Sequence, residues 1–193
     1  MDRGTKVFWL IIAALFCASA VFGTLAEDRR RAAQTRGGDL ATGDMVQLHR
    51  ATDGDTLVVR TTDGEQIVVR LLGIKSFEPA PDKDPVAAIG REAIAALEKR
   101  VAGRPLRVLL HSTPKDRHGR TIATLIAGEE DIGLYLVSQG LALVYPVYPF
   151  QTLPMYLDVQ SKARAEAKGL WANADTARRA ESLLTEWGKR AAE

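Results

Sequence analysis

The feature that most restricts the fold of this chain is a series of five short segments rich in β-branched and aliphatic residues. The five predicted strands are Met45–Ala51, Thr56–Arg60, Ile67–Ile74, Leu106–Ser112 and Arg120–Ala127. An Asp63-Gly64 pair lies between the second strand and the third, and this dipeptide favours the tight turn of a β-hairpin. We therefore expect the second and third strands to pair with each other.

Helical segments complete the predicted fold. They cover residues 85–101, 132–139, 153–168 and 174–191. Asp131 can cap the second of these helices, and glycines at 103, 140 and 169 end the first three. Three strands, a helix, two strands and then helices predict an α+β fold. Five short strands with an inserted helix are compatible with a five-stranded OB-type β-barrel with packed α-helices.

The N-terminal region is a hydrophobic segment separate from this pattern. Val7–Ala26 is a run of 20 residues without a charge, which as a helix would just span a bilayer core of roughly 30 Å. Arg3 and Lys6 precede the run, as in the basic start of a signal peptide. We expect an N-terminal hydrophobic helix that either anchors the protein in a membrane or is cleaved after export to the periplasm or the medium. The arginines directly after the run favour the anchor.

Composition limits the functions open to the rest of the chain. Residues 27–43 lack a hydrophobic period and are predicted to form a flexible linker. The formal net charge is +2, and its excess of bases lies within the first 43 residues, so the part from Asp44 onward is neutral. An anion-binding site there must be built locally from a few arginines. The single cysteine, Cys17, has no disulfide partner within the chain.

Four polar segments interrupt the predicted strands and loops. They are Asp53–Thr56, Arg70 in the third strand, Lys75–Glu78 and Asp116–Arg120. Arg70 is the most informative, because an unpaired guanidinium in an apolar strand is costly. It must reach solvent, pair with a carboxylate or face a polar cavity. Each segment taken alone also fits an ordinary turn or a solvated loop.

Taken together, the segments resemble the staphylococcal-nuclease-like, or thermonuclease, family. The resemblance covers about Met45 to Trp171 and rests on DGDT at 53–56, RLLGI at 70–74, Glu78, DRHGR at 116–120, QGLA at 139–142 and KGLW at 168–171. It implies an OB-type barrel and hydrolysis of phosphodiester bonds in DNA or RNA, usually with calcium. The predicted domains are a signal peptide or membrane anchor at 1–26, a linker at 27–43, a thermonuclease-like domain at 44–173 and a helical extension at 174–193.

The resemblance also implies a role for each matching site residue. Asp55 matches the family's first metal-binding aspartate. Arg70 and Arg120 match the two arginines that hold the scissile phosphate and stabilise the transition state, which suits the bidentate binding of phosphate by guanidinium groups. Glu78 matches the glutamate that activates or positions the attacking water. We expect the two arginines to face one pocket with Asp55 and Glu78.

The sequence departs from the family pattern at the metal site. The family's second metal-binding aspartate falls at the position of Lys75, and Phe77 replaces the proline before Glu78. Calcium takes about six to eight oxygen ligands, so this exchange removes a carboxylate ligand and adds a repelling charge. Calcium is therefore doubtful as the cofactor of this chain. We expect Lys75 to pair with Asp55 or Glu78 and to stand in partly for the missing cation.

Three residues with flat rings are candidates for contacts with nucleic acid. His118 stands where the family commonly has a tyrosine, beside the phosphate. Tyr145 and Tyr148 lie where the family places tyrosines near the bound nucleotide, and they equally fit a role in covering the end of the barrel.

Two functions fit these observations. The first is a nuclease with an altered metal site, acting on DNA or RNA and associated with a membrane through residues 7–26. The alternative is a catalytically inactive nuclease-fold module that binds nucleic acid or a protein partner.

Overall fold

The structure is a computed structural model that describes residues 39–80 and 86–191. The described residues from Leu40 onward form one compact unit. The predicted hydrophobic helix at Val7–Ala26 lies outside the described residues. No helix within 39–80 and 86–191 is long and apolar enough to cross a membrane.

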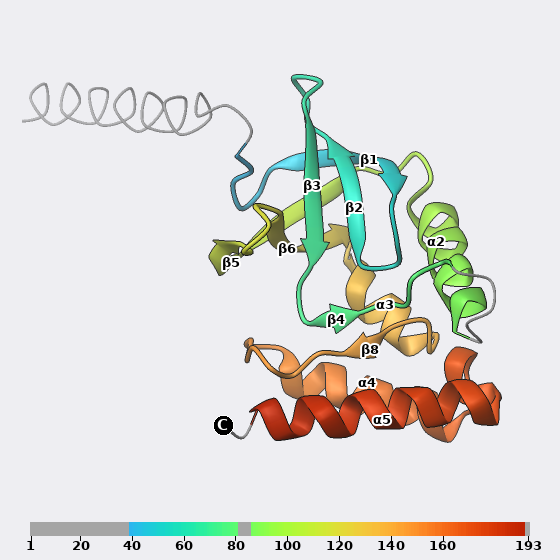
Figure 1. Ribbon diagram of the computed structural model, residues 1–193. Coiled ribbons are helices and arrows are strands. Elements are labelled where there is room, and N and C mark those ends of the chain that lie inside the picture. Colours follow the sequence, from blue (N-terminus) through green and yellow to red (C-terminus); the bar gives the residue numbers. More distant parts are fainter. Residues whose placement is uncertain (1–38, 81–85, 192–193) are drawn as a thin grey trace, which may run out of the picture. The chain divides into compact units, whose positions relative to one another are not determined.

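Five strands form a closed barrel in the described part of the chain (Figure 1). They are β1 (Met45–Ala51), β2 (Thr56–Arg60), β3 (Gln66–Leu71), β5 (Leu106–Lys115) and β6 (Thr121–Ala127). The strands follow the order β3-β2-β1-β5-β6 with antiparallel pairing throughout, and a parallel pairing of β3 with β6 closes the barrel. The predicted α+β fold with a five-stranded barrel is confirmed.

The register of the β2–β3 hairpin determines which side chains share a face. The turn forms at Asp63-Gly64 as predicted, with Gly64 at φ +87° and a hydrogen bond from the Thr61 N–H to the Glu65 carbonyl. Pairing from this turn brings Thr56 opposite Arg70. Alternate residues of the strands, among them Leu57, Val59, Val69, Val108 and Leu125, are fully buried in the core.

The prediction of the third strand, Ile67–Ile74, is wrong after Leu71. Strand β3 ends at Leu71, and the chain turns at Gly73, whose φ of +71° lies in the left-handed region that disfavours other residues. The two residues after the turn form β4 (Ile74–Lys75), which pairs with β8 (Leu143–Val144) in a separate small sheet. The turn at Gly73 thus places Lys75 outside the barrel wall.

The helices cover one side and one end of the barrel. Helix α2 (Ala87–Val101) lies beside it, and α3 (Ile132–Ser138) begins after the short strand β7 (Glu130–Asp131). Asp131 caps α3 by accepting a hydrogen bond from the Leu134 N–H at 3.1 Å, as predicted. Helices α4 (Leu153–Ala165) and α5 (Ala174–Ala191) lie beyond the β4–β8 sheet in Figure 1.

Helix α4 is shorter than the predicted segment 153–168. It ends at Ala165, and Ala167 adopts a positive φ of +51° before the 3₁₀ helix η1 (Gly169–Ala172). The chain must turn here because Gly169 packs directly on the backbone of Gly140, where any side chain would collide.

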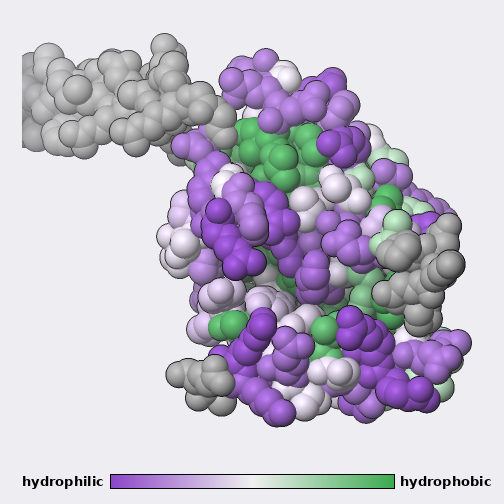
Figure 2. All heavy atoms as spheres, in the orientation of Figure 1, coloured by the Kyte–Doolittle hydropathy of each residue, from purple (hydrophilic) through white to green (hydrophobic). Residues whose placement is uncertain are grey.

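The surface view is dominated by polar residues on the face it shows, with an apolar area over the barrel (Figure 2). The large apolar side chains exposed in the described residues are Met45, Val68, Tyr148, Met155 and Leu157. Of these, only Tyr148 is a predicted site residue.

Candidate active site

A buried ion pair forms the centre of the candidate site. The Arg70 Nη1 atom lies 2.5 Å from Oδ1 of Asp55, whose side chain is only 1% exposed. Arg70 also donates to the Asp55 carbonyl at 3.2 Å and, through Nη2, to the Ile74 carbonyl at 2.7 Å. The expectation that Arg70 needs a partner is confirmed, and that partner is the aspartate that the hairpin register brings beside it.

Both oxygens of Asp55 are fully engaged by donors from the chain itself. Oδ1 also accepts from the Thr56 hydroxyl at 3.0 Å, and Oδ2 accepts from the Ser76 N–H at 2.6 Å. The Lys75 Nζ atom lies 3.6 Å from Oδ2. Burial alone would raise the pKa of Asp55, but the charges of Arg70 and Lys75 lower it below its usual value. Asp55 is therefore an ionised, buried carboxylate whose two oxygens are bound by protein donors.

The turn before Asp55 is held by close packing. Asp53 accepts a hydrogen bond from the Asp55 N–H at 2.8 Å, and the Gly54 N–H donates to the Ser76 hydroxyl at 3.0 Å. A Cβ atom on Gly54 would lie 2.6 Å from the Cβ of Ala93 in α2, so the turn sits directly on that helix. Burial and the nearby Asp55 charge raise the pKa of Asp53 to about 6.

Arg120 approaches the same place from the loop between β5 and β6. Its Nε atom donates to Oδ2 of Asp116 at 2.7 Å, and its backbone N–H donates to Oδ1 of that carboxylate at 2.9 Å. The His118 N–H donates to the same Oδ1 at 2.8 Å. Burial alone would raise the pKa of Asp116, but the Arg120 hydrogen bonds hold it below its usual value. Asp116 therefore fixes both the loop and the Arg120 guanidinium.

A chain of hydrogen bonds joins the two arginines. Arg120 donates through Nη1 to the Thr56 hydroxyl at 3.3 Å, Thr56 donates to Asp55, and Asp55 pairs with Arg70. Residues 50 positions apart in the sequence thus meet through a single threonine and a single aspartate. Two guanidinium groups held in this way present donors suited to a tetrahedral oxyanion.

Comparison with known protein families identifies the family of this chain. A family model described as staphylococcal nuclease homologue matches residues 68–173 of the chain. The chain belongs to the staphylococcal nuclease family.

Three relatives illustrate the range of this family. An "uncharacterized endonuclease" of Haemophilus influenzae is 36% identical over 122 residues, which are 63% of this chain and 63% of that protein. A "thermonuclease" of Staphylococcus intermedius is 30% identical over 128 residues, 66% of this chain and 75% of that protein. A "thermonuclease" of Staphylococcus hyicus is 27% identical over 176 residues, 90% of this chain and all of that protein.

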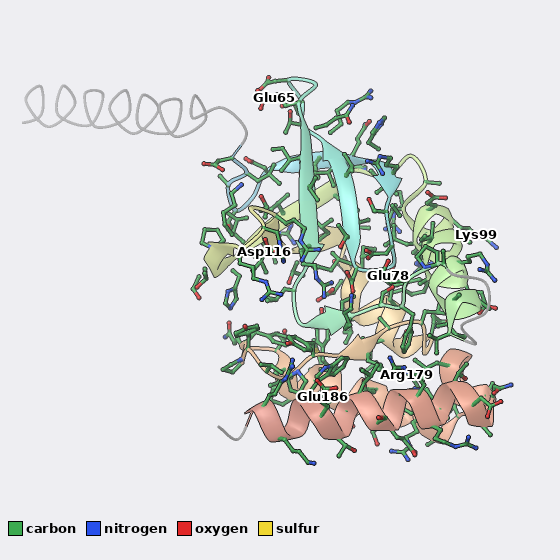
Figure 3. The ribbon with its side chains drawn as sticks, viewed as in Figure 1. Glu65, Glu78, Lys99, Asp116, Arg179 and Glu186 are labelled. Atoms are coloured by element: carbon green, nitrogen blue, oxygen red, sulfur yellow. The ribbon has the colours of Figure 1, made fainter. Side chains whose placement is uncertain are left out.

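The other predicted site residues of this nuclease-family chain make fewer contacts than the two arginines. Glu78 is exposed and makes no hydrogen bond or ion pair with another described residue. In Figure 3, Glu78 and Asp116 lie near the same end of β2 and β3, with those strand ends between them in the view. Of the two carboxylates considered for Lys75, the one in contact is Asp55.

The three candidate ring residues divide between two places. His118 is exposed in the β5–β6 loop, where its Nε2 atom pairs with Arg117 at 3.0 Å. Tyr145 and Tyr148 follow β8, with ring centroids 6.1 Å apart. Tyr145 is half-buried, whereas Tyr148 is 68% exposed. One ring therefore helps to cover the fold, and the other is free to contact a ligand.

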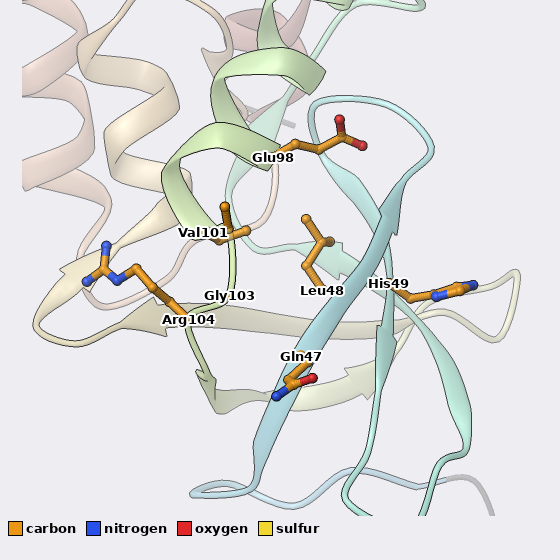
Figure 4. A pocket seen from close by; sticks show the side chains of 8 residues that line it. Gln47, Leu48, His49, Glu98, Val101, Gly103 and Arg104 are labelled. Carbon is orange, nitrogen blue, oxygen red and sulfur yellow. The ribbon is translucent and has the colours of Figure 1, made fainter.

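The described residues contain no cluster of three or more His, Cys, Asp or Glu side chains that could hold a metal ion. A separate hollow of about 240 Å³ lies between β1 and the end of α2, lined by Gln47, Leu48, His49, Glu98, Val101, Ala102, Gly103 and Arg104 (Figure 4). None of these is a predicted site residue.

Two residues that organise the site were not among the predicted site residues. Thr56 connects the two arginines, and Asp116 orients Arg120. The hairpin turn could have revealed the first, because pairing outward from Asp63-Gly64 sets Thr56 opposite Arg70. The spacing of Asp116 and Arg120 could have revealed the second, because a turn of this length brings the two side chains together.

Proposed function

We propose that this protein is a nuclease that hydrolyses phosphodiester bonds in DNA or RNA at the Arg70–Arg120 site. The observation that carries the proposal is the hydrogen-bonded chain from Arg120 through Thr56 and Asp55 to Arg70. Membership of the staphylococcal nuclease family supports it, as do relatives named endonuclease and thermonuclease.

The two arginines bind the phosphate and stabilise the transition state. Each guanidinium uses only part of its five N–H donors on the protein, so donors are left for phosphate oxygens. Because the carboxylates of Asp55 and Asp116 fix both groups in advance, little reorganisation is needed as negative charge develops. Arg70 and Arg120 are the catalytic arginines of this proposal.

Glu78 acts on the water. An exposed carboxylate that has no partner among the described residues can accept a proton from a water molecule or orient it. The water oxygen bonds to phosphorus and gives its proton to Glu78, one P–O ester bond breaks, and the departing alkoxide oxygen takes a proton from solvent water. The products are a phosphomonoester and an alcohol.

The residues present do not fit a calcium ion at the family's metal position. The remaining family ligand, Asp55, already has both oxygens engaged, and the second position carries the ammonium group of Lys75. A cation at this point would have to displace Arg70 or Lys75 from the carboxylate. We therefore propose that Lys75 supplies the positive charge at this position, and that phosphate binding proceeds without calcium.

A specific observation also favours the alternative of an inactive binding module. Lys75 is a single point charge that cannot hold several phosphate oxygens and a water together, as a metal ion can. In this alternative, Arg70 and Arg120 hold the phosphate of a nucleic acid, and Glu78 has no substrate water to activate.

We further propose that residues 1–26 place the protein at a membrane or export it. In this proposal, residues 27–43 link that segment to the nuclease domain at 44–173. Residues 174–193 extend the domain. The uncharged run Val7–Ala26 supports this location. Fractionation of cells expressing the full chain tests it: an intact N-terminus in the soluble cytosolic fraction would refute the proposal.

Cleavage of labelled single-stranded DNA and RNA by the full-length protein in mild detergent tests the proposed activity. The reactions contain calcium, another divalent ion, or EDTA. Glu78→Gln removes the proposed base, Arg70→Gln removes a phosphate ligand, and Arg107→Gln is the matched control, since Arg107 is exposed on β5 outside the site.

We expect cleavage by the wild type and by Arg107→Gln, and a loss of roughly 100-fold or more in both site variants. Binding without cleavage, abolished by Arg70→Gln, would establish the inactive module instead. Cleavage that is unaffected by both site variants would show that the reaction takes place elsewhere in the protein.

A further inference from the structure

Helix α5 lies outside the part of the chain that the family model matches, yet it contacts a residue beside the proposed site. The family match ends at residue 173, and α5 spans Ala174–Ala191. Its one tryptophan, Trp187, is 5% exposed and belongs to the core. Helix α5 is therefore not part of the family match, yet it buries a large aromatic ring against the domain.

Trp187 packs on one member of the tyrosine pair. The ring centroids of Trp187 and Tyr145 are 5.0 Å apart with an interplanar angle of 83°, the edge-to-face geometry that aromatic pairs prefer. Tyr145 in turn lies 6.1 Å from Tyr148, whose ring is 68% exposed. The three rings form a series from the buried face of α5 to solvent.

The backbone connects this series of rings to the phosphate site. The Tyr145 N–H donates to the Gly73 carbonyl at 2.9 Å, and the preceding residue, Val144, pairs with Ile74. The Ile74 carbonyl accepts a hydrogen bond from Arg70 at 2.7 Å. The backbone of Tyr145 is thus held next to the residue that positions Arg70, so its side chain has a fixed starting point relative to the phosphate-binding group.

We propose that Trp187 is a positioning residue that fixes Tyr145, so that the exposed Tyr148 ring is held where it stacks on a base of the bound nucleic acid. The proposal rests on the proposed function, because it needs a nucleic acid whose phosphate is bound at Arg70. It assigns α5 a part in substrate binding without direct contact to the substrate.

The physical reason is preorganisation. An exposed tyrosine that can adopt several rotamers loses conformational entropy when a base stacks on it, and a neighbour that already restricts its position removes part of that cost. Trp187 acts on Tyr148 only through Tyr145, so its effect should appear in the binding of bases and be absent from the binding of the sugar-phosphate backbone.

Binding measurements on two matched oligonucleotides test this role. One is a fluorescent single-stranded DNA of eight nucleotides or so, and the other has the same length and phosphates but abasic sugars. The full-length protein carries Glu78→Gln throughout, so that the oligonucleotides are not cleaved. Trp187→Leu keeps an apolar side chain but removes the ring edge, and Trp187→Phe restores an aromatic ring. Leu184→Ala is the control, since Leu184 is a partly buried residue of the same helix.

We expect Trp187→Leu to weaken binding of the base-containing DNA by about fivefold or more and to leave binding of the abasic DNA unchanged. Trp187→Phe should recover most of the affinity, and Leu184→Ala should change neither. In a Tyr148→Ala background, Trp187→Leu should cause no further loss, because the two residues act through one contact. Equal weakening of both DNAs, or additive losses with Tyr148→Ala, would overturn the proposal. Failure of the parent protein to bind either DNA would instead contradict the proposed function.

Discussion

The two arginines of the site are held in different ways. Arg70 projects from a barrel strand, its side chain is 15% exposed, and it pairs with a carboxylate that the core buries almost completely. Arg120 belongs to a loop, its side chain is 32% exposed, and it pairs with Asp116 four residues earlier in the same loop. One arginine is positioned by the tertiary fold and the other by its local sequence.

This difference separates stability from binding in the proposed nuclease. Removal of Arg70 leaves a buried carboxylate with one cation fewer, so the whole domain should be affected. Removal of Arg120 frees a partly exposed loop carboxylate, which water can solvate. Both arginines would bind the same phosphate, but only Arg70 is also part of the structural core.

The largest expected effect is on global stability. Arg70→Met should lower the free energy of unfolding by roughly 3–5 kcal/mol, since it breaks a buried ion pair from one side. Arg120→Met should lower it by less than about 1 kcal/mol. Urea denaturation of both variants, at an unchanged m-value, measures the two costs. Equal losses would mean that the loop is as much a part of the cooperative core as β3.

A smaller loss of stability is expected when a glycine beside each arginine's carboxylate partner or loop is replaced by alanine. A methyl group on Gly54 would lie 2.6 Å from the Cβ of Ala93, which has no rotamer to move away, so Gly54→Ala should cost about 2–3 kcal/mol. Gly119, in the Arg120 loop, has a φ of +77° and open space around it, so Gly119→Ala should cost only about 1 kcal/mol. Thermal unfolding compares the stability of the two variants. A larger loss of stability for Gly119→Ala than for Gly54→Ala would contradict the expectation that the Arg120 loop contributes less to stability than the Asp55 turn.

The smallest effect is a pH dependence confined to the loop. The pKa of Asp116 is lowered in the folded protein from its ordinary 3.8, so its stabilising contribution is present above that value and is lost as the pH falls through the lower, folded value. At pH 6, Asp116→Asn should therefore be about 1 kcal/mol less stable than wild type. The difference should shrink below about pH 4, and a difference that persists unchanged at pH 2 would contradict this assignment.

The sequence predicted those parts of the fold that depend on local patterns. Alternating apolar residues marked the strands, Asp63-Gly64 marked the hairpin, and Asp131 marked the start of α3. The break of the third strand was missed, because the left-handed turn at Gly73 is stabilised by distant packing against Phe150. Local patterns carry no information about a partner that lies far away in the sequence.

The sequence named Arg70 and Arg120 as members of the candidate site, but it missed the parts played by Thr56 and Asp116. Arg70 needed a partner on physical grounds, yet the choice of Asp55 depends on the hairpin register and the burial of the DGDT turn. The contact of Trp187 with Tyr145 depends on how α5 docks, which its amphipathic sequence alone leaves open. Side-chain partners across elements are set by tertiary packing, so they emerge only in the assembled structure.

The most direct test of the account is a calcium titration of wild type and Lys75→Asp. Lys75 lies 3.6 Å from Asp55 and is proposed to supply the charge at the family's metal position. Lys75→Asp replaces an ammonium group with a carboxylate that can bind calcium. The variant should therefore bind calcium measurably by isothermal titration calorimetry and gain calcium-dependent cleavage. Wild type should bind calcium at least tenfold more weakly, corresponding to about 1.4 kcal/mol or more, and its phosphate binding should survive EDTA. Brisk calcium-dependent cleavage by wild type, unchanged in Lys75→Asp, would contradict the account.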